Sequence, residues 1–267
     1  MDKEKSLGEI IAEVDAQLKA GEDAVAEARL REAIAAYTEA EPGNVVGRSV
    51  LLNELGSFYR HRGIFDKGEE AFLKAKELLE ELREYAYQVD GSIPGGAQAP
   101  QEEGDKDGRG ESQSRTQIIY TNRTMTANYA TTLNNLAGLY RMSKQLQKAA
   151  ETFDAAIKAY ETCEGDVPPD DFASSYNNKG LLYLDMQDTH QARAMFLKAK
   201  ALLETGGNYP YALGTTISNL GFAAVIERKF PEAIECFKAA KALFEEAGDR
   251  QMVQNCEKIR AQLEAAR

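Results

Sequence analysis

The fold is decided by residues 126–160, which read TANYATTLNNLAGLYRMSKQLQKAAETFDAAIKAY. Apolar side chains recur here at spacings of three and four, which is the spacing of one face of an α-helix. The stretch therefore predicts two amphipathic helices joined by a tight turn. Their apolar faces are made by Leu133, Leu136, Ala137 and Tyr140 in the first helix and by Ala149, Phe153 and Ala156 in the second.

The same pair of helices recurs along the chain. Two copies follow, 43 and then a further 41 residues on; one copy precedes the pair beyond an interruption, and a fainter copy stands 42 residues before that. The position of Leu136, here called the anchor position, is held in the other clear copies by Leu55, Lys179 and Leu220. Neither helix of a pair can bury its face alone, so the pairs are expected to stack into one array.

The pattern resembles the tetratricopeptide repeat, whose consensus is W-x2-L-G-x2-Y, A-x3-F and P. The most specific match is TTLNNLAGLYR followed by an Ala-x3-Phe helix. The period near 42 is similar to the longer repeats of kinesin light chains and their bacterial relatives. The chain departs from the consensus because it has no tryptophan, and because Lys179 and Gly68 replace an anchor leucine and a packing alanine.

This resemblance implies an all-α, right-handed solenoid that forms a single domain. The expected units cover residues 6–43, 44–82, 125–166, 168–208 and 210–248. Glycine and proline mark the ends of the predicted helices. A further amphipathic helix at residues 249–266 is expected to cap the last unit.

Residues 83–124 interrupt the array as an insertion. Their middle, DGSIPGGAQAPQEEGDKDGRGESQS, has almost no large apolar residue, which predicts a disordered tip. On one side of it residues 84–89 alternate in polarity, and on the other residues 116–121 are β-branched and aromatic. These flanks could pair as a hairpin of two strands, or they could lengthen the neighbouring helices.

Composition excludes several classes of protein. The formal charge is −11 and no dense Lys/Arg cluster is present, which argues against nucleic acid as a partner. No apolar window is long enough for a membrane span, and the charged start MDKEKSLGEIIAEVD does not fit a signal peptide, so we expect a cytoplasmic protein. Cys163, Cys236 and Cys256 are too far apart for a metal knuckle or a CxxC pair. No catalytic or cofactor motif is found, so we expect no metal, no cofactor and no enzymatic activity.

Asparagine recurs beside the anchor position, although it is a poor helix former. Its amide both donates and accepts hydrogen bonds, so a column of asparagines could hold the backbone of an extended peptide. In the resembled family, asparagines at this register of the first helices often do so in a concave groove. The alternative is that they bond neighbouring helices and fix their stagger. The candidates are Asn135, Asn178 and Asn219 directly before the anchor, and Asn53, Asn134 and Asn177 one residue earlier.

Two arginines also recur, Arg60 and Arg141, each after a repeat tyrosine. Later units carry Leu184 and Val225 at this register, so the groove is expected to be basic in its N-terminal half and apolar in its C-terminal half. Arginine favours bidentate contacts with a carboxylate or phosphate. The alternative is that both arginines are solvated and paired with surface carboxylates.

These features predict a protein–protein interaction scaffold or adaptor, with an extended and acidic peptide or protein segment in the groove. Fold alone does not give function. A self-assembling structural module that forms homo-oligomers and a peptide-sensing regulatory module stay open as alternatives. An enzyme with a site that carries no motif is a third.

Overall fold

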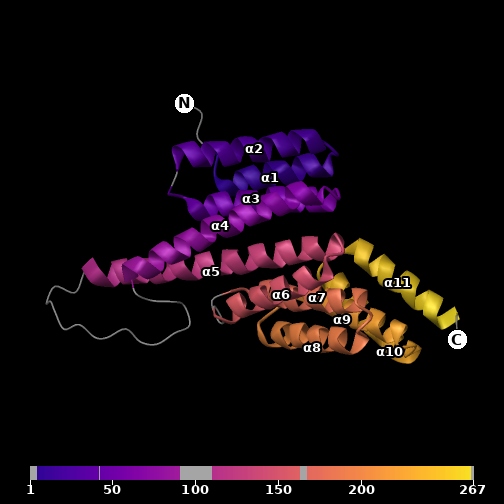
Figure 1. The fold of residues 1–267 in the computed structure, drawn as a ribbon. Helices are drawn as coiled ribbons and strands as arrows, with labels where there is room; N and C mark the ends of the chain where they lie inside the picture. Colours follow the sequence, from indigo (N-terminus) through magenta and orange to yellow (C-terminus); the bar gives the residue numbers. More distant parts are fainter. Residues whose placement is uncertain (1–4, 42, 91–109, 163–166, 266–267) are drawn as a thin grey trace. The chain divides into compact units, whose positions relative to one another are not determined.

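The computed structural model describes residues 5–41, 43–90, 110–162 and 167–265, and within these ranges it is helical with no strand (Figure 1). The chain divides into two compact units. The first unit is residues 1–145 with 158–164, and the second is residues 146–157 with 165–267. The prediction that all repeats form one continuous domain stays a prediction.

The first unit contains five complete helices, and each packs on the next. Helix α3 also contacts α5. Because α1, α3 and α5 are the first helices of their repeats, this contact is the one that repeat stacking requires. The bounds are α1 Leu7–Lys19, α2 Asp23–Ala40, α3 Val45–His61, α4 Phe65–Asp90 and α5 Gly110–Met142.

The second unit contains five complete helices and most of α6, which spans Leu146–Glu161. Its first helices α7 and α9 contact each other, as α3 and α5 do in the first unit. The terminal helix α11 packs on α10, which agrees with the predicted cap. The bounds are α7 Pro169–Asp185, α8 Thr189–Thr205, α9 Pro210–Ile226, α10 Phe230–Glu246 and α11 Arg250–Ala265.

Local sequence explains where several helices begin. Ser6 accepts a hydrogen bond from the backbone N–H of Glu9, whose carboxylate in turn accepts from the Ser6 N–H at 2.8 Å, which is a capping box. Asn44 caps α3 and Asp188 caps α8 in the same way, through the backbone N–H three residues on. These side chains satisfy amide groups that the first helical turn leaves unpaired.

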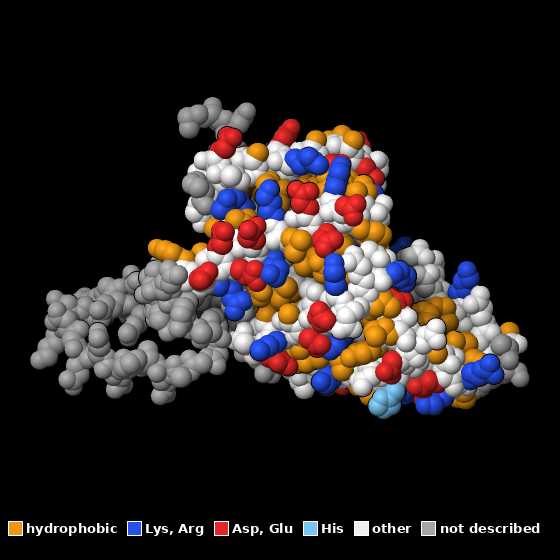
Figure 2. Space-filling view, in the orientation of Figure 1, with side chains coloured by type: hydrophobic (Ala, Val, Ile, Leu, Met, Phe, Trp, Pro, Cys, Tyr) orange, Lys and Arg blue, Asp and Glu red, His pale blue; other side chains and the backbone are white. Residues whose placement is uncertain are grey.

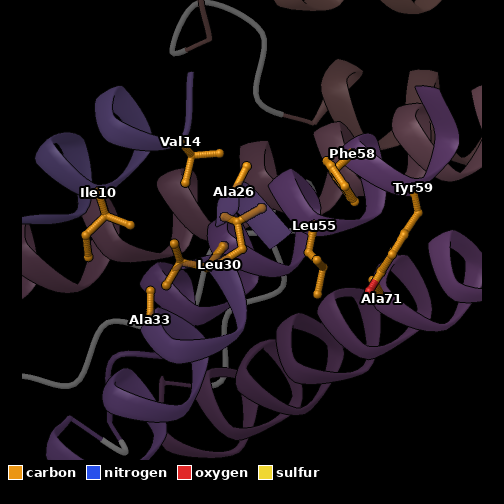
Figure 3. Packing of buried hydrophobic residues seen from close by; sticks show 10 residues of the cluster. Ile10, Val14, Ala26, Leu30, Ala33, Leu55, Phe58, Tyr59 and Ala71 are labelled. Atoms are coloured by element: carbon orange, nitrogen blue, oxygen red, sulfur yellow. The ribbon is translucent and has the colours of Figure 1, made fainter. Parts of the chain in front are cut away.

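Small residues let the two helices of a repeat approach closely, as the sequence predicted. A Cβ atom added at Gly56 would lie 2.6 Å from the ring of Phe72, and one added at Gly180 would lie 2.4 Å from the ring of Phe196. Figure 3 shows the resulting core of the first unit, which joins α1, α2, α3 and α4. Its members are Ile10, Val14, Ala26, Leu30, Ala33, Leu51, Leu55, Phe58, Tyr59 and Ala71.

Two of the departures from the repeat consensus, Gly68 and Lys179, have a structural reason. A Cβ atom at Gly68 would lie 2.7 Å from Leu139 Cδ1, so glycine makes room for α5. Lys179 is buried along its aliphatic stem, while its ammonium group pairs with Asp154 of α6 and lies 5.7 Å from the centroid of the Tyr183 ring. A lysine can fill an apolar position in this way because its charged end still reaches a partner at the surface.

The hairpin hypothesis for the insertion is wrong. Residues 84–90 continue α4, and residues 110–124 form the start of α5, so the flanks lengthen the neighbouring helices. Side chains at the base of the insertion join the two helices: Tyr129 donates a hydrogen bond to Glu80 at 2.7 Å, and the guanidinium of Arg83 lies 4.7 Å from the Tyr129 ring centroid. The predicted disordered tip falls mainly on residues 91–109, which lie outside the described residues.

Candidate functional site

The asparagine two residues before the anchor position joins neighbouring first helices. In the first unit, Asn53 of α3 is buried, and its Nδ2 donates to Thr132 Oγ1 of α5 at 2.7 Å. In the second unit, Asn177 of α7 is likewise buried and donates to Thr216 Oγ1 of α9 at 2.7 Å. The same bond thus recurs between the same two registers of successive repeats.

The threonines that accept these bonds were missed by the sequence reasoning. A signal for them was present, because Thr132 and Thr216 each stand four residues before an anchor leucine. Each threonine also donates to the carbonyl four residues earlier in its own helix, at 2.8 and 2.9 Å. This internal bond orients the hydroxyl so that a lone pair faces the asparagine.

Asn219 bonds a neighbouring helix, as the second of the two alternatives for the asparagines expects. It is buried, and its Nδ2 donates to Asn177 Oδ1 at 3.3 Å, which is a bond between α9 and α7. Asn134 is buried, Asn178 is half-buried, and both are engaged in interactions of their own. Asn219 therefore belongs, with Asn177, to the hydrogen bonds that join α7 to α9.

Asn135 behaves differently from these asparagines. Its side chain is half-buried on α5, and its amide makes no hydrogen bond within the described ranges. Its backbone carbonyl accepts a hydrogen bond from Arg60 Nη1 of α3 at 3.4 Å. The backbone of Asn135 therefore contacts the Arg60 guanidinium, while its side-chain amide keeps its own donors and acceptor.

Arg60 and Arg141 lie close enough for their charges to interact. Burial lowers the pKa of Arg60, the charge of Arg141 lowers it further, and Glu54 partly offsets both effects. Burial likewise raises the pKa of Glu54, with Asp15 adding to the rise and Arg60 opposing it. The first helices of this unit therefore carry half-buried charges of both signs on one face.

The guanidinium of Arg60 does not use all of its hydrogen-bond donors. Its Nε is buried and has no hydrogen-bond partner among the residues that the structure describes. A Cβ atom at Gly138 would lie 2.9 Å from Arg60 Nη1, so the glycine leaves room for the guanidinium on α5. Buried polar groups in proteins are normally paired, and the Arg60 Nε is an exception among the described residues.

The second unit has an apolar hollow of about 390 Å³ beside α9 and α11. The half-exposed Phe222 stands at this hollow. Burial raises the pKa of the Cys256 thiol in the same hollow, which makes it a packing residue with little thiolate. The lining residues are Ser218, Phe222, Phe237, Met252, Asn255, Cys256, Lys258, Ile259 and Gln262.

Charge on the visible surface is mixed. Acidic and basic side chains alternate over the first unit on the face shown in Figure 2. No group of three or more His, Cys, Asp or Glu residues that could hold a metal ion occurs within the described ranges. In the same ranges, none of the helices combines the length and hydropathy that crossing a bilayer requires.

Known proteins share this fold. The chain is similar to BtubC (BKLC) from P. vanneervenii, with 16% identity, a TM-score of 0.56, and coverage of 98% of this chain and 92% of that chain. It is also similar to a putative kinesin light chain with nearly identical TPR-like repeats from Podosopora anserina, with 13% identity, a TM-score of 0.57, and coverage of 91% and 96%. Aspartyl phosphate phosphatase F from Bacillus subtilis gives 16% identity, a TM-score of 0.56, and coverage of 98% and 70%.

These likenesses, at such low identity, concern the fold alone, and they confirm the predicted tetratricopeptide-like α-solenoid with kinesin light chain-like repeats. No curated protein matches the sequence. The family model described as "Soluble NSF attachment protein, SNAP" matches residues 96–267, which is more than half of the chain. The chain therefore belongs to the soluble NSF attachment protein family.

Proposed function

We propose that the protein is a non-enzymatic scaffold or adaptor that binds an extended peptide or protein segment on the face formed by its first helices. In the first unit this face is built by α3 and α5. The observation that carries the proposal is the half-buried guanidinium of Arg60, whose Nε has no partner within the described part of the chain.

The chemistry of this face favours an acidic residue in the ligand. A carboxylate would accept hydrogen bonds from Arg60, and it would relieve the repulsion between Arg60 and Arg141 that lowers the Arg60 pKa. Asn135, whose backbone carbonyl accepts a bond from Arg60, has a side-chain amide that can bond the ligand backbone whatever its side chains are. Bidentate anion binding combined with backbone contacts suits an extended segment.

Three buried asparagines hold first helices together, each within its own unit. Asn53, Asn177 and Asn219 are bonded to neighbouring helices, so we assign them to fixing the stagger of the first helices. This was the alternative that the sequence left open. Asn134, Asn178 and Arg141 stay candidates for ligand contact.

The test begins with capture of a partner from a lysate of the source cells and with mapping of the bound segment. Its affinity is then measured for the wild type, Arg60→Ala, Asn135→Ala and the control Arg250→Ala, which removes an exposed arginine of α11. Arg60→Ala should weaken binding by about 1.5–3 kcal/mol, the range for hydrogen bonds to charged groups. The loss should shrink at high salt.

The proposal fails if the affinity is indifferent to Arg60→Ala while circular dichroism shows an intact fold. It also fails if Arg250→Ala weakens binding as much as Arg60→Ala does. Asn135→Ala should cost about 0.5–1.5 kcal/mol, the net value of a neutral hydrogen bond.

Self-association is the second candidate function. It is favoured by a hollow of about 380 Å³ on α1 and α2, whose walls include Ile10, Ala33 and Tyr37. Such a surface at the first repeat could receive a second copy of the chain. Light scattering decides this candidate, because the monomer has a mass of 29.4 kDa. A larger mass that returns to this value in a variant with Ala36→Lys, an exposed residue of the same hollow, would support it.

A further inference from the structure

A second pocket lies in the first unit, among residues that the proposed function does not use. Its volume is about 280 Å³, and its walls come from α2, α3 and α4. In Figure 3, Leu55 and Tyr59 of α3 stand beside α4, where Ala71 is located. The lining residues are Arg31, Ile34, Leu52, Leu55, Tyr59, Lys67, Glu70, Ala71 and Lys74.

The floor of this pocket is apolar. Leu52, Leu55 and Ala71 are buried against the core, and Ile34 of α2 is partly exposed above them. The volume is close to the lower limit for small-molecule sites, which usually bury a whole ligand of drug size. A pocket of this size and polarity fits one bulky apolar side chain.

The rim is basic, although the chain as a whole has a charge of −11. Three cations line the pocket with one carboxylate, Glu70. Arg31 is fixed, because its Nη2 donates to the Tyr59 hydroxyl at 2.7 Å and lies 3.1 Å from a carboxylate oxygen of Glu27. Lys67 and Lys74 are exposed, and neither forms an ion pair with a residue that the structure describes.

The repeat itself does not require these lysines. Lys67 directly precedes the packing residue Gly68, and in the last repeat Glu232 precedes Ala233 in the same way. Lys67 lies 5.4 Å from the centroid of the Tyr59 ring, so its charge stands over the wall of the pocket. The pocket thus combines an apolar floor with two exposed lysines that form no ion pair with a described residue.

We infer that this pocket docks a partner protein through a leucine-like side chain flanked by acidic residues. The apolar side chain fills the floor, and Lys67 and Lys74 meet the flanking carboxylates. Burial of the apolar side chain supplies the affinity, while the exposed charges steer the approach and select acidic partners. This site is separate from the face that carries Arg60.

The test uses blocked pentapeptides as probes and follows methyl groups of the full-length protein by NMR. The probe Glu-Asp-Leu-Glu-Asp should shift the methyl signals of Ile34, Leu52 and Leu55 and leave those of Leu203 in the second unit unchanged. So short a probe should bind with a dissociation constant on the order of 1 mM. Replacing its leucine with serine should weaken binding by at least about tenfold, because the apolar contact is lost.

Matched variants separate the pocket from general charge effects. Lys67→Glu with Lys74→Glu should weaken the leucine probe by about tenfold. The control pair Lys158→Glu with Lys238→Glu makes the same change in net charge at exposed positions outside the pocket, and it should bind like the wild type. Arg60→Ala should also leave this binding unchanged, which keeps the result independent of the proposed function.

Two results would overturn the role of the apolar floor. The first is that the pocket methyl signals do not shift at about 10 mM probe, which is ten times the expected dissociation constant. The second is that the serine probe binds as tightly as the leucine probe. Equal binding of Lys-Lys-Leu-Lys-Lys would refute the role of charge. The same holds if the control pair loses as much affinity as the Lys67 and Lys74 pair.

Discussion

The bond between Asn177 and Thr216 should stabilise the second unit by tying α7 to α9. Asn177→Ala removes the 2.7 Å bond to Thr216 and also removes the acceptor for the Asn219 amide. Two neutral hydrogen bonds are each worth about 0.5–1.5 kcal/mol net. Alanine is the better helix former and returns about 0.5 kcal/mol, so the expected loss is about 0.5–2.5 kcal/mol.

A double-mutant cycle isolates this bond from the other effects of each substitution. Thr216→Val keeps the shape of the side chain but removes the oxygen that Asn177 reaches. The coupling between the two substitutions should be about 0.5–1.5 kcal/mol, measured from urea unfolding followed by circular dichroism. Asn135→Ala is the matched control, since its amide has no hydrogen bond within the described ranges, and its effect should stay within about 0.5 kcal/mol.

The reasoning is refuted if the coupling falls below about 0.3 kcal/mol, which is the usual error of additivity. It is also refuted if Asn135→Ala costs as much as Asn177→Ala. In either case the short distance between the Asn177 and Thr216 side chains would carry no net stabilisation.

Three further predictions follow from packing and burial. Phe153→Ala should lower the free energy of unfolding by about 3–5 kcal/mol, because the ring is fully buried. Gly180→Ala should cost about 1–3 kcal/mol by overpacking against Phe196, whereas Gly8→Ala, which has open space, should change stability by less than about 1 kcal/mol. Burial, with the bond to a carboxylate, raises the pKa of Tyr140 to about 12, so an ultraviolet titration should show a tyrosine that ionises well above the ordinary value. Because this pKa is raised in the folded state, the stabilisation is complete below about pH 10 and is lost as the pH rises toward 12.

The sequence predicted most helices because their apolar positions repeat in phase with the core. The observed α2, Asp23–Ala40, lies within the predicted unit at residues 6–43. The observed α6, Leu146–Glu161, lies within the predicted unit at residues 125–166. The apolar side chains recur at helical spacing because each helix buries one face. That face is buried by the stacking of helix pairs, which also defines the fold.

The flanks of the insertion could not be predicted by the same signal. Residues 84–89 alternate over too few positions to separate a strand from a helix. The structure shows α4 packed on α5, with Tyr129 bonded to Glu80 and facing Arg83. These interactions join residues far apart in the sequence, so no local pattern reports them.

The sequence shows that asparagine recurs beside the anchor position, but the recurrent asparagines fall into two groups with different contacts. Neighbouring helical residues point about 100° apart, so two consecutive side chains cannot both face the next helix. Asn53 and Asn177, two residues before the anchor, face the neighbouring first helix and bond its threonine. Glu54 and Asn135 stand directly before the anchor position. Their side chains are half-buried in the first unit.

This division also explains why the two asparagine registers differ in what they can offer a ligand. A side chain that spans two helices has used its donors, while a side chain on the open face keeps them. Asn219 is an exception to this rule. It stands directly before the anchor position, as Asn135 does, and it still donates a hydrogen bond to Asn177. A ligand that binds the first helices should therefore depend on Asn135 and Arg60, and it should sense Asn53 and Asn177 only through the positions of the helices that they join.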